Sequence, residues 1–275
     1  MKSNRRNFLK TATIAGAGAM TGGALIGFKP QEVESKLQKI QDSAKKSHTQ
    51  RFNMCGYAAP AIPTVRIGII GLGDRGSDAV QRLSYIDGVE IKALGDKREV
   101  AVKESQKYLG KIGRPAAKEF FGDENIWKKL VELPDLDLIY TCTPWILHTT
   151  ISVYAMEHGK HVACEVPVAR TIDEAWQLVE TSERTKKHCM MLENCCYDFF
   201  ELLTLNMARQ GLFGDIIHGE GAYIHNLLGM NFKKPIDDKQ VDGAYTDMWR
   251  LKEMLPAMVI CIRLMDWVPF ARYLI

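Results

Sequence analysis

The segment Gly71-Leu72-Gly73-Asp74-Arg75-Gly76 has the glycine spacing of a loop that holds a diphosphate. Glycines let backbone N–H groups approach phosphate oxygens more closely than a Cβ atom would allow, and the N-terminus of a following helix adds partial positive charge. The spacing alone is weak evidence. However, residues 65–70 before it form a β-branched run of strand length, and residues 76–83 after it have helical spacing of apolar side chains. Strand, glycine loop and helix in this order predict a dinucleotide site.

Asp96 extends this prediction to the ribose. It follows a second apolar strand at residues 89–95 and lies about 20 residues after the last glycine, where a carboxylate that binds the ribose 2′-hydroxyl is expected. A carboxylate repels a 2′-phosphate, so Asp96 favours NAD over NADP, although Lys97 and Arg98 reduce that repulsion. The alternative is that Asp96 caps the N-terminus of the next helix.

The alternation of strands and helices continues through the middle of the chain. Helices are expected at residues 99–109, 126–132, 149–158, 172–185 and 199–209, and strands at residues 138–142, 161–164 and 190–194. This order predicts an α/β fold, a Rossmann-type doubly wound parallel sheet. A glycine-bounded break at residues 211–214 and a strand at residues 216–225 then predict the start of a second domain, for which the family resemblance described below implies an incomplete α+β open sheet.

Polar or aromatic residues follow the predicted strands: Trp145, His148, Glu165 and Asn194. Because ligands bind at the carboxyl ends of parallel strands, we expect these side chains to line one site. For Trp145 the alternative is packing in the core, and for His148 it is capping of the helix that follows.

The N-terminal residues have the features of an export signal. Asn4-Arg5-Arg6-Asn7-Phe8-Leu9-Lys10 precedes an uncharged stretch rich in alanine and glycine at residues 11–28. The paired arginines followed by Phe-Leu-Lys resemble a twin-arginine signal. A membrane anchor is the alternative, but the recurring glycines weaken a spanning helix. We therefore expect the twin-arginine export machinery as a partner, a bacterial periplasmic location and no membrane span in the mature chain.

The remaining patterns divide the chain. Residues 1–28 are the expected signal, 29–63 a polar linker with one short helix at 32–47, 64–198 the dinucleotide-binding domain, 199–253 the start of a substrate domain and 254–275 a tail. The first 62 residues hold ten Lys/Arg and three Asp/Glu and carry a net charge of +7, whereas the remaining residues carry −4. The part expected to fold is therefore mildly acidic, which argues against a nucleic-acid partner. The seven cysteines form no Cys-x-x-Cys pair, which argues against a zinc or redox motif, and their odd number in apolar stretches predicts buried thiols and no metal site.

Motifs throughout the middle of the chain support a family resemblance. They are Trp145-x-x-His148, Glu165-Val166-Pro167, Glu193-Asn194-Cys195-Cys196-Tyr197, Glu220-Gly221-Ala222-Tyr223-Ile224-His225 and Trp249-Arg250-Leu251-Lys252. From about residue 65 to residue 253 the chain resembles glycoside hydrolase family 109. These are NAD-dependent α-N-acetylgalactosaminidases within the glucose–fructose oxidoreductase and inositol dehydrogenase superfamily (Gfo/Idh/MocA). Dehydrogenases of that superfamily carry Glu-Lys-Pro with the lysine as acid/base, whereas Val166 cannot transfer a proton.

The resemblance implies a cofactor site and a substrate site. NAD would be held by Gly71, Gly73, Asp74, Arg75, Gly76, Asp96, Trp145, His148, Glu165, Val166 and Asn194. Tyr223 and Arg250 would contact the sugar; the alternatives are a core aromatic and a surface ion pair. The implied reaction on glycans that contain α-linked N-acetylgalactosamine oxidises the sugar 3-hydroxyl, eliminates the glycosidic group, adds water and reduces the ketone. NAD is therefore regenerated in each cycle.

Residues 254–275 do not resemble the family, whose next motif, Asn-Gly-Asn-Leu-Tyr-Pro-Thr-His-Gly-Leu-Gly-Pro, supplies acid/base and sugar-binding groups. Residues 258–270 can be back-translated so that a reading frame shifted by two bases encodes Gly-Asn-Leu-Tyr-Pro-Thr-His-Gly-Leu-Gly-Pro-Val. This predicts a frameshift after Glu253, which resequencing of the gene would test. Because the motif that supplies the acid/base groups is not in the sequence, no catalytic residue is assigned. An incomplete second domain exposes sheet edges, which predicts self-association into a homo-oligomer. A periplasmic NAD(P)-dependent sugar dehydrogenase and a non-catalytic NAD-binding remnant stay open as alternatives.

Overall fold

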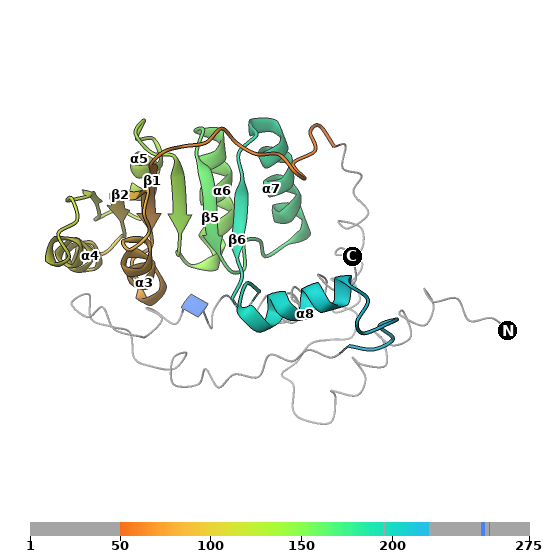
Figure 1. Ribbon diagram of the computed structural model, residues 1–275. Coiled ribbons are helices and arrows are strands. Elements are labelled where there is room, and N and C mark those ends of the chain that lie inside the picture. The colour runs from red at the N-terminus through yellow and green to blue at the C-terminus, as the bar shows by residue number, and fades with distance from the viewer. Residues whose placement is uncertain (1–49, 195, 220–248, 251–252, 254–275) are drawn as a thin grey trace, which may run out of the picture. The chain divides into compact units, whose positions relative to one another are not determined.

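The computed structural model describes residues 50–194, 196–219, 249–250 and 253 (Figure 1). These residues contain a six-stranded parallel sheet in the order β3-β2-β1-β4-β5-β6. The strands are β1 (Val65–Ile70), β2 (Val89–Gly95), β3 (Lys118–Phe120), β4 (Leu138–Thr141), β5 (His161–Glu165) and β6 (Cys189–Leu192). The strand order reverses between β1 and β4, so the predicted Rossmann sheet is confirmed and its ligand crevice falls at the carboxyl ends of these two strands.

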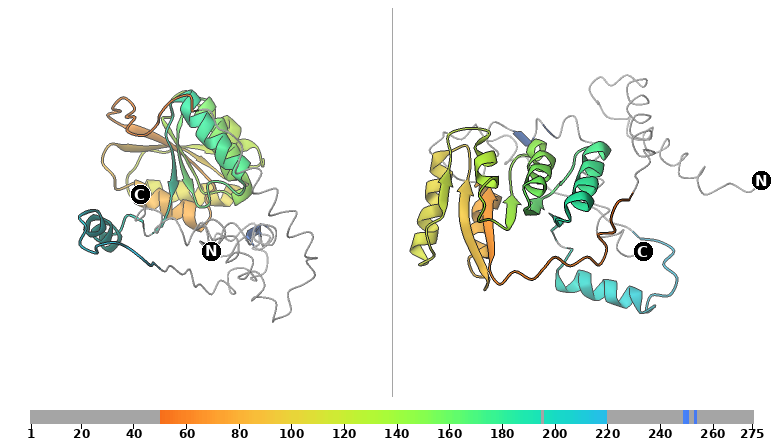
Figure 2. Two further views of the ribbon diagram at one scale, coloured as in Figure 1. Left: turned by 90° about the vertical axis from the view of Figure 1, so that its right-hand side faces the viewer. Right: turned by 90° about the horizontal axis from the view of Figure 1, so that it is seen from above.

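Helices cover both faces of the sheet (Figure 2). One face packs against α3 (Asp74–Leu83) and α4 (Glu99–Lys111), with Ile67 and Ile69 of β1 in that core. The other packs against α5 (Ile126–Val131), α6 (His148–Glu157) and α7 (Ile172–Thr185), with Ile70 of β1 in that core. A strand buried on both sides needs apolar residues at successive positions, which explains the β-branched run of β1.

Several local features differ from the prediction. Helix α3 begins at Asp74 rather than at residue 76, and a short 3₁₀ helix, η1 (Trp145–Leu147), precedes α6. Strand β3 was not predicted because its sequence, Lys-Glu-Phe, is short and largely charged. Of the predicted strand at residues 216–225, the described residues 216–219 are not in a strand, and the rest lies outside the described residues. Helix α8 (Phe199–Arg209) has the predicted bounds.

The described part of the predicted linker lies along the domain, beside the end of α7 (Figure 1). The Arg51 backbone N–H donates to the Glu183 carboxylate at 3.0 Å, and the Lys186 ammonium group lies 4.9 Å from the centre of the Phe52 ring. The predicted signal, most of the linker and the helix at residues 32–47 lie outside the described residues. None of the described helices is long and apolar enough to cross a membrane. The described cysteines are free thiols: Cys164 and Cys196 are buried as predicted, Cys142 and Cys189 are half-buried, and for Cys55, which is exposed, the prediction is wrong.

An ion pair joins the amino ends of β1 and β4. The Asp137 carboxylate accepts the Arg66 backbone N–H at 2.9 Å and binds the Arg66 guanidinium at 2.7 and 2.8 Å. The hydrogen bonds from Arg66 lower the pKa of Asp137 below its ordinary value of 3.8. Because the folded-state pKa lies below the unfolded-state value, this pair stabilises the fold above about pH 4, and its contribution is lost as the pH falls further.

We therefore expect Asp137→Asn to lower the melting temperature at neutral pH by roughly 2–4 °C. The difference from the wild type should shrink at about pH 3, which lies below the ordinary carboxylate pKa of 3.8, because the stabilisation by the charged pair is progressively lost there. Calorimetry at the two pH values measures this effect, with Asp87→Asn as a control because Asp87 is exposed. An equal loss at both pH values would assign the effect to packing rather than to charge.

Candidate functional site

The loop between β1 and α3 is folded so tightly that two of its glycines have no room for a side chain. At Gly71, where φ is +86°, a Cβ atom would lie 2.7 Å from the carbonyl group of Cys142. At Gly76 it would lie 1.8 Å from the Gly71 carbonyl oxygen. At Gly73, the N-cap residue of α3, no atom lies within 4 Å of that position and no side chain caps the helix. The outer glycines therefore shape the loop, and Gly73 leaves space for an anion at the helix N-terminus.

Asp96 connects the end of β2 to the glycine loop. One carboxylate oxygen accepts the Leu72 N–H at 2.7 Å, and the other accepts the Arg98 backbone N–H at 2.8 Å and lies 3.4 Å from Arg98 Nε. Arg98 is the N-cap residue of α4, so the alternative that Asp96 caps this helix is wrong. Asp96 thus lies beside the expected diphosphate loop, where a ribose-binding carboxylate belongs, with an ion-paired arginine next to it.

Arg75 joins the glycine loop to the ends of two other strands. Its Nε atom lies 3.4 Å from Oε1 of Glu165, the last residue of β5, and its guanidinium donates to Oδ1 of Asn194, which follows β6. The same Glu165 oxygen accepts the Tyr140 hydroxyl of β4 at 3.0 Å. The structure therefore brings together Arg75, Glu165 and Asn194 from separate strand ends, as the parallel sheet predicts.

The environment fixes the charge states of two of these groups. Burial raises the pKa of Tyr140 far above its usual range, and Cys142 and Glu165 act in the same direction, so Tyr140 is a neutral donor to Glu165. Burial lowers the pKa of Arg75, but the charge and hydrogen bond of Glu165, together with Tyr140 and Asp78, outweigh this effect and the pKa is raised overall. Arg75 is therefore a permanent cation at the edge of the glycine loop.

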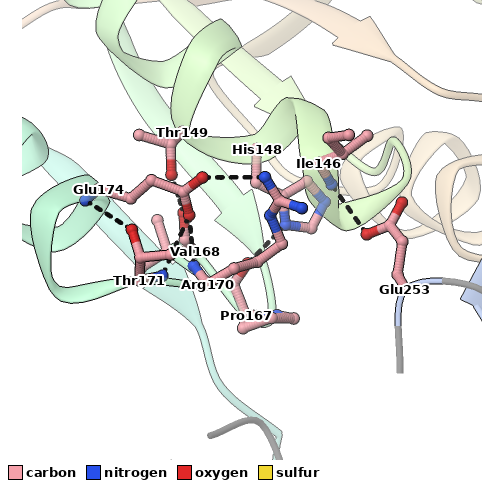
Figure 3. A network of polar contacts seen from close by, with 9 residues as sticks. All are labelled: Ile146, His148, Thr149, Pro167, Val168, Arg170, Thr171, Glu174 and Glu253. Carbon is pink, nitrogen blue, oxygen red and sulfur yellow. Dashed lines mark hydrogen bonds and ion pairs between the residues drawn. The ribbon is translucent and has the colours of Figure 1, made fainter. Parts of the chain in front are cut away.

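His148 connects the loops that follow β4 and β5 (Figure 3). Its Nδ1 lies 2.7 Å from the Pro167 carbonyl oxygen and its Nε2 lies 2.8 Å from that of Thr143. Burial lowers the pKa of His148, while the two carbonyls raise it, and the net direction is down. His148 is the first residue of α6 and makes no capping bond, so the capping alternative is wrong. Both ring nitrogens face carbonyls, so the observed geometry makes His148 a link between loops, and a direct contact with NAD stays a prediction.

Trp145 and Arg250, predicted to bind cofactor and sugar respectively, are in contact. Trp145 is buried at the start of η1, directly after the loop that follows β4. The Arg250 guanidinium carbon lies 5.4 Å from the centre of the Trp145 ring, and the Trp249 ring meets the same ring edge-on at 5.7 Å. Burial of Trp145 fits both core packing and a wall of a ligand site.

Three further predicted site residues are not tested by these contacts. Tyr223 lies outside the described residues, Asp74 is exposed and Val166 is half-buried, so their roles stay predictions.

Two residues at this edge of the sheet are not singled out by the sequence patterns. Tyr140 and its neighbour Thr141 carry hydroxyls in a buried strand, and that is the signal that could have identified Tyr140. Glu253 contacts the backbone of Ile146, 107 positions away, and no local pattern indicates such a contact. Among the residues that the structure describes, no group of three His, Cys, Asp or Glu side chains is placed to hold a metal ion.

Comparison with known sequences gives matches along most of the chain. Residues 65–193 match an oxidoreductase family with an NAD-binding Rossmann fold, and residues 197–255 match the glycosyl hydrolase 109 C-terminal domain. A glycosyl hydrolase family 109 protein of Porphyromonas gingivalis is 51% identical over 216 residues, which are 78% of this chain and 44% of the relative. An α-N-acetylgalactosaminidase of Bacteroides fragilis is 53% identical over 180 residues, 66% of this chain and 42% of the relative. The chain thus spans less than half the length of these relatives.

Solved structures show the same fold. A myo-inositol 2-dehydrogenase from Lactobacillus plantarum matches with a TM-score of 0.53 and 23% identity, over 61% of this chain and 47% of that one. A scyllo-inositol dehydrogenase from Lactobacillus casei, solved with NAD(H) and scyllo-inositol, matches with a TM-score of 0.50 and 22% identity, over 56% of this chain and 43% of that one. At this level of identity the likeness establishes the Rossmann fold alone.

Proposed function

Because the chain belongs to glycosyl hydrolase family 109, we propose that its site serves an NAD-dependent glycosidase that removes α-linked N-acetylgalactosamine from glycans. The substrate follows from the name of the Bacteroides fragilis relative. The observation that carries the proposal is the Glu165-Val166-Pro167 turn at the end of β5, beside the cofactor loop. An apolar Val166, which cannot transfer a proton, occupies the place of the acid/base lysine of the dehydrogenases that the chain resembles, so the chain departs from the dehydrogenase motif at this position.

The described residues fit NAD. The open space at Gly73 and the uncapped start of α3 suit the diphosphate, and Asp96 beside this loop suits the ribose hydroxyls. Arg75, held by Glu165 and Asn194, places a positive charge at the same edge of the sheet. The chemistry that NAD supplies when bound is reversible hydride transfer with the sugar ring, which leaves no net NADH. Trp145, predicted to contact NAD, touches Arg250, predicted to contact the sugar, so the two halves of the proposed site meet here.

Release of nitrophenol from nitrophenyl α-N-acetylgalactosaminide tests the proposal, with NADH fluorescence followed in the same cuvette. We expect nitrophenol release without accumulation of NADH, in this chain or in a version that continues after Glu253 in the family-like reading frame. Stoichiometric NADH without nitrophenol would instead identify a sugar dehydrogenase, which Val166 disfavours. A rise in melting temperature with NAD, but no turnover in either version, would identify a non-catalytic remnant.

We further propose that the N-terminal residues direct export through the twin-arginine machinery to the periplasm. The proposal is supported by the pattern of Asn4-Arg5-Arg6 and the uncharged residues that follow. That route carries folded proteins and therefore suits a chain that must acquire NAD in the cytoplasm.

Replacement of Arg5 and Arg6 by lysine should reduce the periplasmic fraction of the protein by about tenfold, because the arginine pair is the feature that this route reads. Fractionation and immunoblotting in a bacterium with this machinery measure the effect. Lys2→Arg with Lys10→Arg is the matched control, since it keeps the arginine pair and the charge. Equal periplasmic levels in all variants would contradict the proposal.

A further inference from the structure

Glu253 binds the start of the helical turn that carries Trp145. The first N–H groups of a helix have no partner inside it, and Pro144, the N-cap residue of η1, provides no side-chain cap. Oε2 of Glu253 accepts the Ile146 N–H at 3.0 Å (Figure 3). A carboxylate is well suited to this place, since its negative charge strengthens the hydrogen bond and complements the helix dipole. Glu253 therefore caps η1 from a distant part of the sequence.

The same segment makes two more contacts with the turn. Trp249, Arg250 and Glu253 each have helical conformation and lie within five positions of one another in the sequence. The Trp249 ring meets the Trp145 ring at 83° with 5.7 Å between centres, and the Arg250 guanidinium lies over the Trp145 ring. Three neighbouring side chains thus contact two successive residues, Trp145 and Ile146.

These contacts differ in how strictly they fix the segment. Edge-to-face rings and a guanidinium over a ring tolerate sliding and rotation, because neither contact has a single required atom pair. A hydrogen bond from one N–H to one carboxylate oxygen has a narrow range of distance and angle. Of these three contacts, the Glu253 hydrogen bond therefore restricts the position of the segment most strictly.

We propose that Glu253 is a positioning residue: its bond to Ile146 fixes Arg250 against Trp145 and so aligns the sugar side of the site with the cofactor side. The docking contact is independent of the proposed function, whereas the alignment of a sugar rests on it. Glu253 itself need not touch substrate or cofactor.

Near-ultraviolet circular dichroism of the purified chain tests the docking. The difference between the wild type and Trp249→Phe defines the signal of the tryptophan pair. Glu253→Ala should lose this signal, while Glu253→Gln, which keeps an oxygen acceptor, should retain most of it. Glu104→Ala is the matched control, because Glu104 is an exposed glutamate on α4. NAD affinity by calorimetry should stay within about twofold in every variant, which shows that the Rossmann domain is folded.

Titration with N-acetylgalactosamine at saturating NAD tests the alignment. We expect Glu253→Ala to weaken sugar binding by about tenfold and Glu253→Gln to weaken it much less. A retained tryptophan signal in Glu253→Ala would overturn the proposal, and so would equal losses in the alanine and glutamine variants. Loss of the signal with unchanged sugar affinity would overturn the alignment. If the wild type binds NAD but no sugar, the proposed function and the alignment fail together, while the dichroism still decides the docking.

Discussion

Replacement of Asp96 by alanine is expected to weaken NAD binding by about 100-fold. The carboxylate has two tasks that alanine cannot perform. It accepts the Leu72 N–H at 2.7 Å, which holds the glycine loop to the end of β2, and it would bind the ribose hydroxyls. Hydrogen bonds to a charged group contribute about 1.5–3 kcal/mol each, so loss of the ribose contact alone accounts for most of the effect.

The same variant should change the preference between cofactors. In the wild type, Asp96 repels a 2′-phosphate and engages Arg98 through its backbone N–H and Nε. Without the carboxylate, the Arg98 guanidinium is released beside the position of the 2′-phosphate, where an arginine accommodates NADP. We therefore expect the ratio of the dissociation constants for NADP and NAD to fall by at least about tenfold, mainly because NAD binds less well.

Calorimetric titration with both cofactors measures these effects. Asp87→Ala is the control, since Asp87 is an exposed aspartate in the connection before β2. Asp96→Asn should keep part of the NAD affinity, because its amide oxygen can still accept the Leu72 N–H. Unchanged NAD affinity in Asp96→Ala would place the ribose elsewhere, and a parallel loss for NADP and NAD would assign Asp96 to loop structure alone.

The elements predicted most closely are those whose residues carry a complete local signal. Strand β1 is mostly β-branched and is followed by Gly71, and strand β2 alternates apolar with charged residues before it ends at Gly95. Helix α7 begins at a capping box in which Thr171 and Glu174 bind each other's backbone N–H groups. Strand β3 has no such signal, because its three residues are held by pairing with β2 at the edge of the sheet. Its conformation is decided by tertiary contact, which a single sequence does not display.

The candidate site also has features that the sequence predicts and features that only tertiary contacts decide. The topology of a parallel sheet is enough to predict that the glycine loop, Glu165 and Asn194 share one edge. The pairing of Arg75 with Glu165 also requires the register of β4 and β5 and the side-chain rotamers, neither of which is encoded in residue spacing. His148 shows most clearly what residue spacing does not predict. Its position after a strand is predictable, but the orientation of its ring, with both nitrogens facing the carbonyls of Pro167 and Thr143, is not.

Alanine at Gly76 and at Gly73 should separate the structural glycine of the loop from the ligand-facing one. At Gly76 the new Cβ atom would lie 1.8 Å from the Gly71 carbonyl oxygen, a backbone atom that cannot turn aside. We expect Gly76→Ala to lower the free energy of unfolding by about 3 kcal/mol or more and to abolish NAD binding. At Gly73 the backbone has φ −74° and no atom lies within 4 Å, so alanine should leave stability nearly unchanged.

Gly73→Ala should nevertheless weaken NAD binding by about tenfold or more, because its methyl group enters the space that the diphosphate would occupy. Urea unfolding without cofactor and NAD titration of each variant together measure the two effects. A stable Gly76→Ala would show that the loop can rearrange. Undiminished NAD affinity in Gly73→Ala would mean that the diphosphate does not lie over this residue, and the cofactor site would then have to be moved away from the N-terminus of α3.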